Sequence, residues 1–154
     1  MSLTDIINQI TIEFSYLDIT INDLLELYHQ IGDNEPTKHQ KAASTQYISQ
    51  FYNGVENILK RICKFYNITL PTGGDSHINL SKMFSNSEQK PLPLLFDDII
   101  INDFAGMRRF RHFVIHGYAF LIEWDKLKDN IAHIESVYEH FKNNVNKFLN
   151  SIQN

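Results

Sequence analysis

Residues 3–31 read LTDIINQITIEFSYLDITINDLLELYHQI, and this stretch decides the fold class. Its apolar side chains recur three or four positions apart: Ile6, Ile10, Phe14, Leu17, Ile21, Leu24, Tyr28 and Ile31. This spacing is typical of one stripe of an amphipathic helix, because an α-helix turns by about 100° per residue. We therefore expect a helix over residues 3–31 whose apolar face packs against other helices.

The next stretch repeats the pattern. We expect a second helix over residues 37–66, with Thr37 as its cap directly after Pro36. Gly54 interrupts this helix, where a glycine costs about 1 kcal/mol relative to alanine. The sequence therefore predicts that another helix crosses closely at Gly54.

The second half of the chain contains two more periodic stretches. A third helix is expected from Phe96 or Asp97 to Tyr118, and a fourth over residues 124–152 with Asp125 as its cap. Between the second and third helices lies a long loop, residues 67–94, with one short helix expected at about 78–84. No alternating strand pattern competes. The sequence predicts an all-α protein, an antiparallel four-helix bundle with an additional short helix.

The composition excludes several classes of protein. With 154 residues the chain has the size of one domain, so we expect a single domain over residues 1–154. The formal net charge of -4 excludes polyanion binding through overall charge but leaves room for a local basic patch. Cys63 is the only cysteine, so we expect a reducing, cytoplasmic setting and a buried thiol. No signal peptide is expected, and no apolar run approaches the roughly 20 residues that cross a membrane.

The third helix carries a basic cluster unlike the rest of the chain. Residues 107–118 read MRRFRHFVIHGY, with three arginines within four positions and two histidines after them. Helical spacing puts Arg109, His112 and His116 close to one face, whereas about 140° separates Arg111 from His116. Since one helix does not bring Arg111 and His116 together, we expect a second copy of the chain to complete the site across a two-fold axis.

These residue types suit the cleavage of RNA. An imidazole can take a proton from a 2′-hydroxyl or give one to a leaving oxygen, and a guanidinium can hold phosphate oxygens. No metal or other cofactor is then required. Two other interpretations stay open: a solvated helix face, or a zinc site on His112 and His116, although no Glu follows His112 as in a metalloprotease helix.

The cluster resembles the signature of a known family. Arg111-His112, three residues and then His116 are similar to the motif of HEPN-domain ribonucleases, and Gly117-Tyr118 completes the pattern of the HepT branch. Residues 51–62, FYNGVENILKRI, resemble the aromatic, Val-Glu and Leu-Lys run of HEPN second helices.

The resemblance implies a specific function. HepT proteins are toxins of type II toxin–antitoxin pairs, and their partner is an MNT-type nucleotidyltransferase antitoxin. A HepT-like chain is expected to form a homodimer and to cut RNA without metal, with Arg111 and His116 as catalytic residues. Relatives often carry Asn or Asp where this chain has His112. The resemblance also places Tyr118 at the position to which some antitoxins transfer AMP.

Several residues keep two interpretations. His112, Arg108 and Arg109 are either catalytic or phosphate-binding residues, or simply solvated charges. Tyr118 follows the apolar stripe of the third helix, which predicts burial, whereas modification requires an accessible hydroxyl. Tyr52 and Tyr138 are the alternative modification sites. In addition, Glu56 is either the ion-pair partner of an arginine of the third helix, which is the expectation, or a catalytic acid.

Two classes of function therefore follow from the sequence. In the first, the protein is an endoribonuclease toxin in which the ribose 2′-oxygen attacks the adjacent phosphorus, with His116 as acid or base and Arg111 on the phosphate. In the second, it is a catalytically silent HEPN-fold bundle that binds a protein partner. The complete set of Arg111, His116 and Tyr118 favours the first class.

Overall fold

The computed structural model describes residues 1–86 and 88–154, and it contains only helices and loops within them. The elements are α1 (Leu3–Ile31), α2 (Lys38–Phe65), α3 (Ser76–Met83), α4 (Ile101–His116), the 3₁₀ helix η1 (Ala119–Leu121) and α5 (Trp124–Ile152). The predicted all-α fold class is confirmed. None of the described helices is long and apolar enough to span a membrane.

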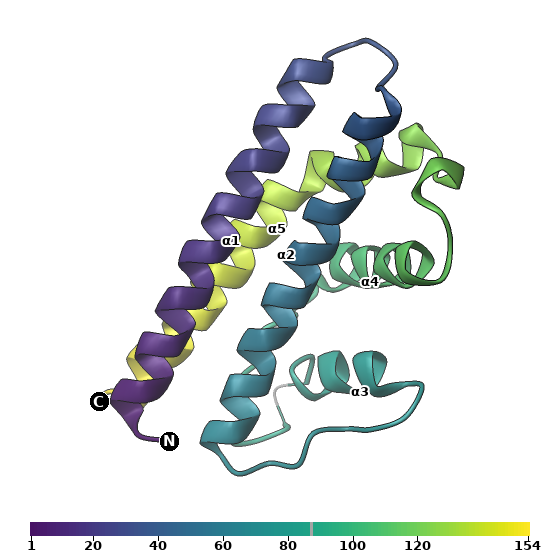
Figure 1. The fold of residues 1–154 in the computed structure, drawn as a ribbon. Coiled ribbons are helices and arrows are strands. Elements are labelled where there is room, and N and C mark those ends of the chain that lie inside the picture. Colours follow the sequence, from purple (N-terminus) through teal and green to yellow (C-terminus); the bar gives the residue numbers. More distant parts are fainter. Residues whose placement is uncertain (87) are drawn as a thin grey trace.

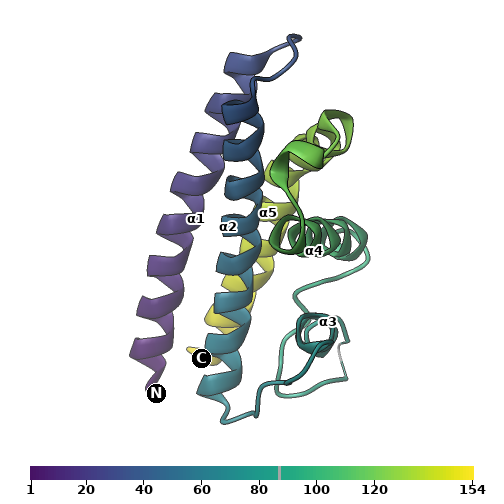
Figure 2. The ribbon, with the colours of Figure 1, turned by 45° about the vertical axis from the view of Figure 1, so that its right-hand side comes forward.

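Three long helices form the body of the molecule. α1 and α2 run side by side in opposite directions, and α5 packs against both, so that the two chain ends lie at the same end of the bundle (Figure 1). The shorter α4 lies across α2 and α5 rather than along them, and α3 lies beside the end of α2 (Figure 1). Figure 2 shows that α3 and α4 occupy the same side of the α1–α2 pair.

The seam between α1 and α2 explains two features of the sequence. A Cβ added to Gly54 would lie 2.5 Å from Cδ2 of Leu17, so only glycine allows this approach. The close crossing predicted at Gly54 is therefore confirmed. Thr37 caps α2 as predicted, because its hydroxyl accepts from the backbone N–H of Gln40 while the Gln40 side chain accepts from that of Thr37.

The segment between α2 and α4 is packed rather than loose. Its apolar side chains join the core, namely Leu80, Phe84, Leu92, Leu95 and Phe96. The carbonyl of Phe84 accepts hydrogen bonds from the backbone N–H groups of Leu95 and Phe96 at 2.9 and 3.1 Å. The short helix in this segment begins at Ser76, two residues earlier than expected, and residues 73–78 line a common cavity with α4.

Both predicted ends of α4 and the predicted cap of α5 are wrong. α4 begins at Ile101 because Asp97, its expected start, instead accepts from the backbone N–H of Ile99 and contacts Nε2 of His140 at 2.6 Å. α4 ends at His116, where Gly117 adopts an extended conformation, so Tyr118 lies outside it. α5 begins at Trp124 as predicted, but Glu123 is the residue before it and Asp125 lies in the first turn rather than at the cap.

Candidate active site

A cavity of about 1000 Å³ lies between α4 and residues 73–78. α4 contributes the basic and imidazole side chains that the sequence singled out, namely Arg108, Arg109, Arg111, His112 and His116. The opposite wall is the glycine-rich loop and first turn of α3. Arg111 and His116 thus line the same cavity within one chain, although about 140° separates them around an ideal helix.

Contacts with α2 hold Arg111 in place. Its Nε donates a hydrogen bond to Oδ1 of Asn53 at 2.6 Å, and its guanidinium carbon lies 5.5 Å from the centre of the Tyr52 ring. Nε is only one of the five N–H donors of the guanidinium, so the other groups are left for a ligand in the cavity. Because both partners lie on α2, the arginine is oriented before any ligand binds.

The other cationic side chains of α4 have different surroundings. Arg108 donates from Nη1 to Oγ of Ser81 at 3.3 Å, which joins α4 to α3. Arg109, His112 and His116 are exposed. The ring centres of His112 and His116 are 4.5 Å apart, as expected one helical turn apart. The two imidazoles therefore offer neighbouring groups that can exchange protons at the same wall of the cavity.

A third histidine, which the sequence analysis did not single out, lines the opposite wall. Nδ1 of His77 lies 2.7 Å from Oε2 of Glu56, whose side chain is 4% exposed. The expectation that Glu56 pairs with an arginine of α4 is therefore wrong. Glu56 is on α2 and contacts the first turn of α3, where His77 lies. No periodic pattern in the sequence signals this contact.

The tyrosines differ sharply in accessibility. Tyr118 is 68% exposed, and the expectation of burial is wrong because α4 ends before this residue and the helical period no longer applies. Tyr52 and Tyr138 are buried, which removes both alternative positions from direct access. Burial, reinforced by the charge of Glu56, raises the pKa of Tyr52 well above its usual value, so its hydroxyl stays neutral. Cys63 is buried, as predicted.

Metal binding depends on how the donor side chains are grouped. Among the described residues, no three His, Cys, Asp or Glu side chains lie close enough together to hold a metal ion. His112 and His116 are two neighbouring donors, and a structural zinc site takes four ligands. What the cavity does offer is a set of positive charges with imidazoles among them, which suits an anionic ligand.

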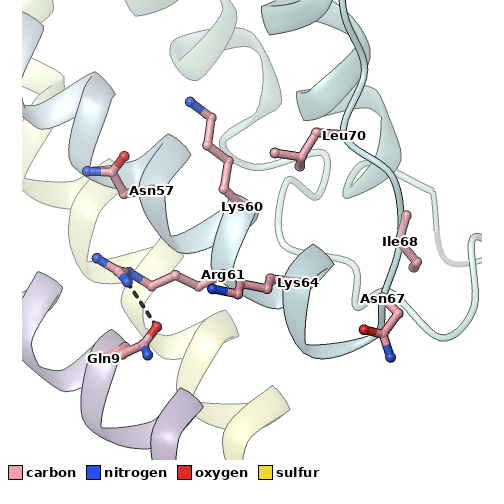
Figure 3. A pocket seen from close by; sticks show the side chains of 8 residues that line it. All are labelled: Gln9, Asn57, Lys60, Arg61, Lys64, Asn67, Ile68 and Leu70. Atoms are coloured by element: carbon pink, nitrogen blue, oxygen red, sulfur yellow. Dashed lines mark hydrogen bonds between the residues drawn. The ribbon is translucent and has the colours of Figure 1, made fainter. Parts of the chain in front are cut away.

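A second hollow, of about 570 Å³, lies between α1, the end of α2 and residues 67–70 (Figure 3). Its cations are Lys60, Arg61 and Lys64, and Arg61 is already paired with Gln9 and Glu13 of α1. None of the side chains that line it is a histidine or a carboxylate. This hollow offers charge but no group suited to proton transfer, so the cavity beside α4 is the candidate active site.

A protein-family model matches most of the chain. The sequence model described as HepT-like protein matches residues 43–152, which include α4 and both walls of the cavity. The chain belongs to the HepT-like family. No curated protein and no solved structure gives a significant match.

The family match covers only part of this HepT-like chain. It contains most of α2 and all of α3, α4 and α5, whereas α1 lies outside it. Three site residues were not recognised from the sequence: Asn53, His77 and Ser81. Of these three, only Asn53 had a signal in the sequence, because it lies within residues 51–62, the run that resembles HEPN second helices.

Proposed function

We propose that this HepT-like chain is the toxin of a type II toxin–antitoxin pair and that it acts as a metal-independent endoribonuclease. Membership of the HepT-like family supports the toxin role. The observation that carries the nuclease role is the cavity beside α4, where three arginines and two histidines of one helix face a common space. A cavity of about 1000 Å³ has room for a phosphodiester and its flanking riboses.

The proposed reaction is the attack of a ribose 2′-oxygen on the adjacent phosphorus. The O2′–P bond forms, the P–O5′ bond breaks, and the products are a 2′,3′-cyclic phosphate and a 5′-hydroxyl. Arg111 holds the phosphate and stabilises the charge that grows on it, since its guanidinium is fixed by Asn53 and Tyr52. His116 exchanges a proton with one of the two oxygens, and His112, Arg108 and Arg109 bind the RNA backbone.

The proposed partner is an MNT-type nucleotidyltransferase that neutralises the toxin. We propose that it transfers AMP from ATP to Tyr118, whose ring is 68% exposed and lies two positions after His116. The new phosphodiester would repel the RNA backbone and compete for the arginines of the cavity. We further propose a homodimer through α4, where the exposed apolar side chains Phe113 and Ile115 also line the cavity, so that the second copy would lie beside the site.

The alternative function is a catalytically silent HEPN-fold bundle that binds a protein partner. Apolar side chains gathered at the end of α4 and on η1 favour protein contacts, namely Phe113, Ile115, Tyr118, Phe120 and Leu121. This surface fits both functions, because a toxin must also bind its antitoxin. The two functions are therefore distinguished by whether RNA is cleaved in the cavity, and not by whether a protein binds beside it.

The test is expression of the chain alone, with growth and RNA integrity followed together. We expect growth arrest with cleaved RNA for the natural chain, and neither effect for Arg111→Ala or His116→Ala. A purified-protein assay with a single 2′-deoxynucleotide at the cleavage position should abolish the cut, because the attacking oxygen is missing. Growth arrest without any cleavage, equal in all variants, would favour the silent bundle.

A further inference from the structure

We propose that His77 is the second proton-transfer residue of this site, the general base that takes the proton from the attacking 2′-hydroxyl, and that Glu56 is its positioning residue. The proposal rests on the nuclease function proposed above and names the group that function leaves unassigned. His116 is then the general acid on the opposite wall. The observations that carry it are the His77–Glu56 contact and the place of His77 in the cavity.

The contact with Glu56 determines which nitrogen of His77 can act. An ionised carboxylate only accepts hydrogen bonds, so Nδ1 of His77 donates to Oε2 of Glu56 across 2.7 Å. Nε2 then carries the lone pair, and no hydrogen bond within the described part of the chain engages it. A carboxylate that holds Nδ1–H fixes the tautomer and orientation of a histidine and stabilises the imidazolium that forms when Nε2 takes a proton.

The two members of the pair differ in exposure, and this difference suits a base and the residue that positions it. The side chain of Glu56 is 4% exposed, whereas that of His77 is 41% exposed and lines the cavity. The carboxylate is thus shielded from solvent while the imidazole is open to a ligand. A buried carboxylate is costly unless it is paired, so Glu56 holds His77 strongly in one orientation.

The two walls of the cavity supply the two proton transfers from different sides. His77 belongs to the wall formed by residues 73–78, and His116 belongs to α4. In-line displacement at phosphorus places the attacking 2′-oxygen and the leaving 5′-oxygen on opposite sides, so a base and an acid on facing walls suit it. His112 shares the wall of His116, at 4.5 Å between ring centres, and does not provide this opposition.

Cleavage moves two protons between the RNA and the two histidines. Nε2 of His77 takes the proton of the 2′-hydroxyl as the O2′–P bond forms, and the imidazolium of His116 gives a proton to O5′ as the P–O5′ bond breaks. His77 ends protonated and His116 ends neutral, the reverse of their starting states. Exchange with water restores both, and no other reactant takes part.

The sharpest test uses an RNA substrate whose leaving 5′-oxygen is replaced by sulfur. A thiolate leaves without help from an acid, so this substrate needs a general base but no general acid. On ordinary RNA we expect His77→Ala and His116→Ala each to cut about 10²- to 10⁴-fold more slowly than the natural chain. On the sulfur substrate, His116→Ala should recover most of the natural rate, and His77→Ala should remain slow.

The matched control is His39→Ala, which removes an exposed histidine of α2 outside the cavity and should cut both substrates at the natural rate. Recovery of His77→Ala on the sulfur substrate would overturn the assignment of the base. If His77→Ala cuts both substrates at the natural rate, His77 transfers no proton. Loss of cleavage in His116→Ala would in that case still support the nuclease function. Absence of cleavage by the natural chain would overturn the nuclease function itself, together with this inference.

The positioning role of Glu56 is tested by the pH dependence of kcat/KM, which a purely structural role would not change. The charged and titratable groups that contact His77 or share its cavity are Glu56 and Tyr52 on α2, Asp75 on its own wall, and Arg108, Arg109, Arg111, His112 and His116 on α4. Glu56→Gln removes only the negative charge from this set. We expect kcat/KM to fall about 10- to 100-fold and its acidic limb to move to lower pH, because the imidazolium loses its carboxylate. A variant that stays folded with an unmoved pH profile would overturn the positioning role.

Discussion

Arg111 on α4 and Asn53 on α2 are 58 positions apart in sequence, yet Nε of the arginine donates to Oδ1 of the asparagine at 2.6 Å. The Tyr52 ring lies under the same guanidinium, 5.5 Å from its central carbon. These two contacts orient the arginine toward the cavity before any ligand enters it. Catalysis gains from such orientation, because the cost of ordering the side chain is met during folding.

We expect Asn53→Ala to lower the rate of RNA cleavage about tenfold, since the hydrogen bond to a charged group contributes roughly 1.5 kcal/mol to orienting Arg111. The measurement is kcat/KM on a short RNA. Asn57→Ala is the matched control, because Asn57 is an exposed asparagine one turn further along α2 that lines the second hollow instead. Equal rates for the two variants would show that Asn53 does not position the arginine.

Cleavage should persist in excess EDTA. The proposed reaction uses imidazole and guanidinium groups alone, and no group of three metal-binding side chains lies among the described residues. The measurement is the cleavage rate before and after chelation, which should be unchanged. Loss of activity on chelation, restored by added zinc, would instead assign His112 and His116 to a metal site.

The chain should sediment as a dimer, at twice its 18.0 kDa mass. Ile115 is an apolar side chain of α4 that is 53% exposed, and a lysine there should disrupt an interface through this helix. Ile19→Lys is the control, because Ile19 is 59% exposed on α1. We expect Ile115→Lys to sediment as a monomer and Ile19→Lys as a dimer. A natural chain that is monomeric and still cuts RNA would show that one copy suffices.

Tyr118→Phe should still cut RNA but escape neutralisation by an MNT-type partner supplied with ATP. The variant keeps the ring and its stacking on Phe120, where the ring centres are 5.5 Å apart, and removes only the hydroxyl that would receive AMP. Mass spectrometry of the co-expressed natural chain should find AMP on Tyr118. Tyr16→Phe is the control, because Tyr16 is also an exposed tyrosine but lies on α1. An unmodified Tyr118 in a neutralised complex would contradict the proposal.

Gly54→Ala should destabilise the fold without touching the cavity. The added Cβ would lie 2.5 Å from Cδ2 and 3.1 Å from Cγ of Leu17, a core side chain with little room to move. Overpacking of this kind costs roughly 1–3 kcal/mol, which lowers Tm by about 2–4 °C for each kcal/mol in a domain of this size. Adding Leu17→Ala should make the Gly54→Ala change less harmful than it is alone. Gly74→Ala, where a Cβ meets nothing within 4 Å, should leave Tm nearly unchanged.

The helices could be predicted because their cause is local. Apolar residues at a spacing of three or four identify α1, α2 and α5, and Thr37 and Gly54 mark a cap and a crossing that the structure confirms. The basic cluster and its likeness to the HEPN motif could also be recognised from the sequence, since both lie within residues 107–118. Each of these signals depends on neighbours in sequence.

The ends of α4 needed tertiary information. Asp97 was a reasonable helix start by charge, but its carboxylate is held by His140 of α5, 43 positions away, and the helix begins four residues later at Ile101. The burial expected for Tyr118 failed for a related reason. It assumed that the helical period continues past Gly117, where the backbone becomes extended.

The helical elements, the family and the basic residues of α4 can thus be read from the amino-acid sequence, because periodicity and motif spacing are properties of contiguous residues. Which groups share the cavity depends on how the helices pack. Asn53 reaches Arg111 and Glu56 reaches His77 because α3 and α4 both pack against α2, and no residue spacing encodes a contact between helices separated by a packed segment. Arg111 and His116 likewise line one cavity, because residues 73–78 supply the second wall that a single helix lacks.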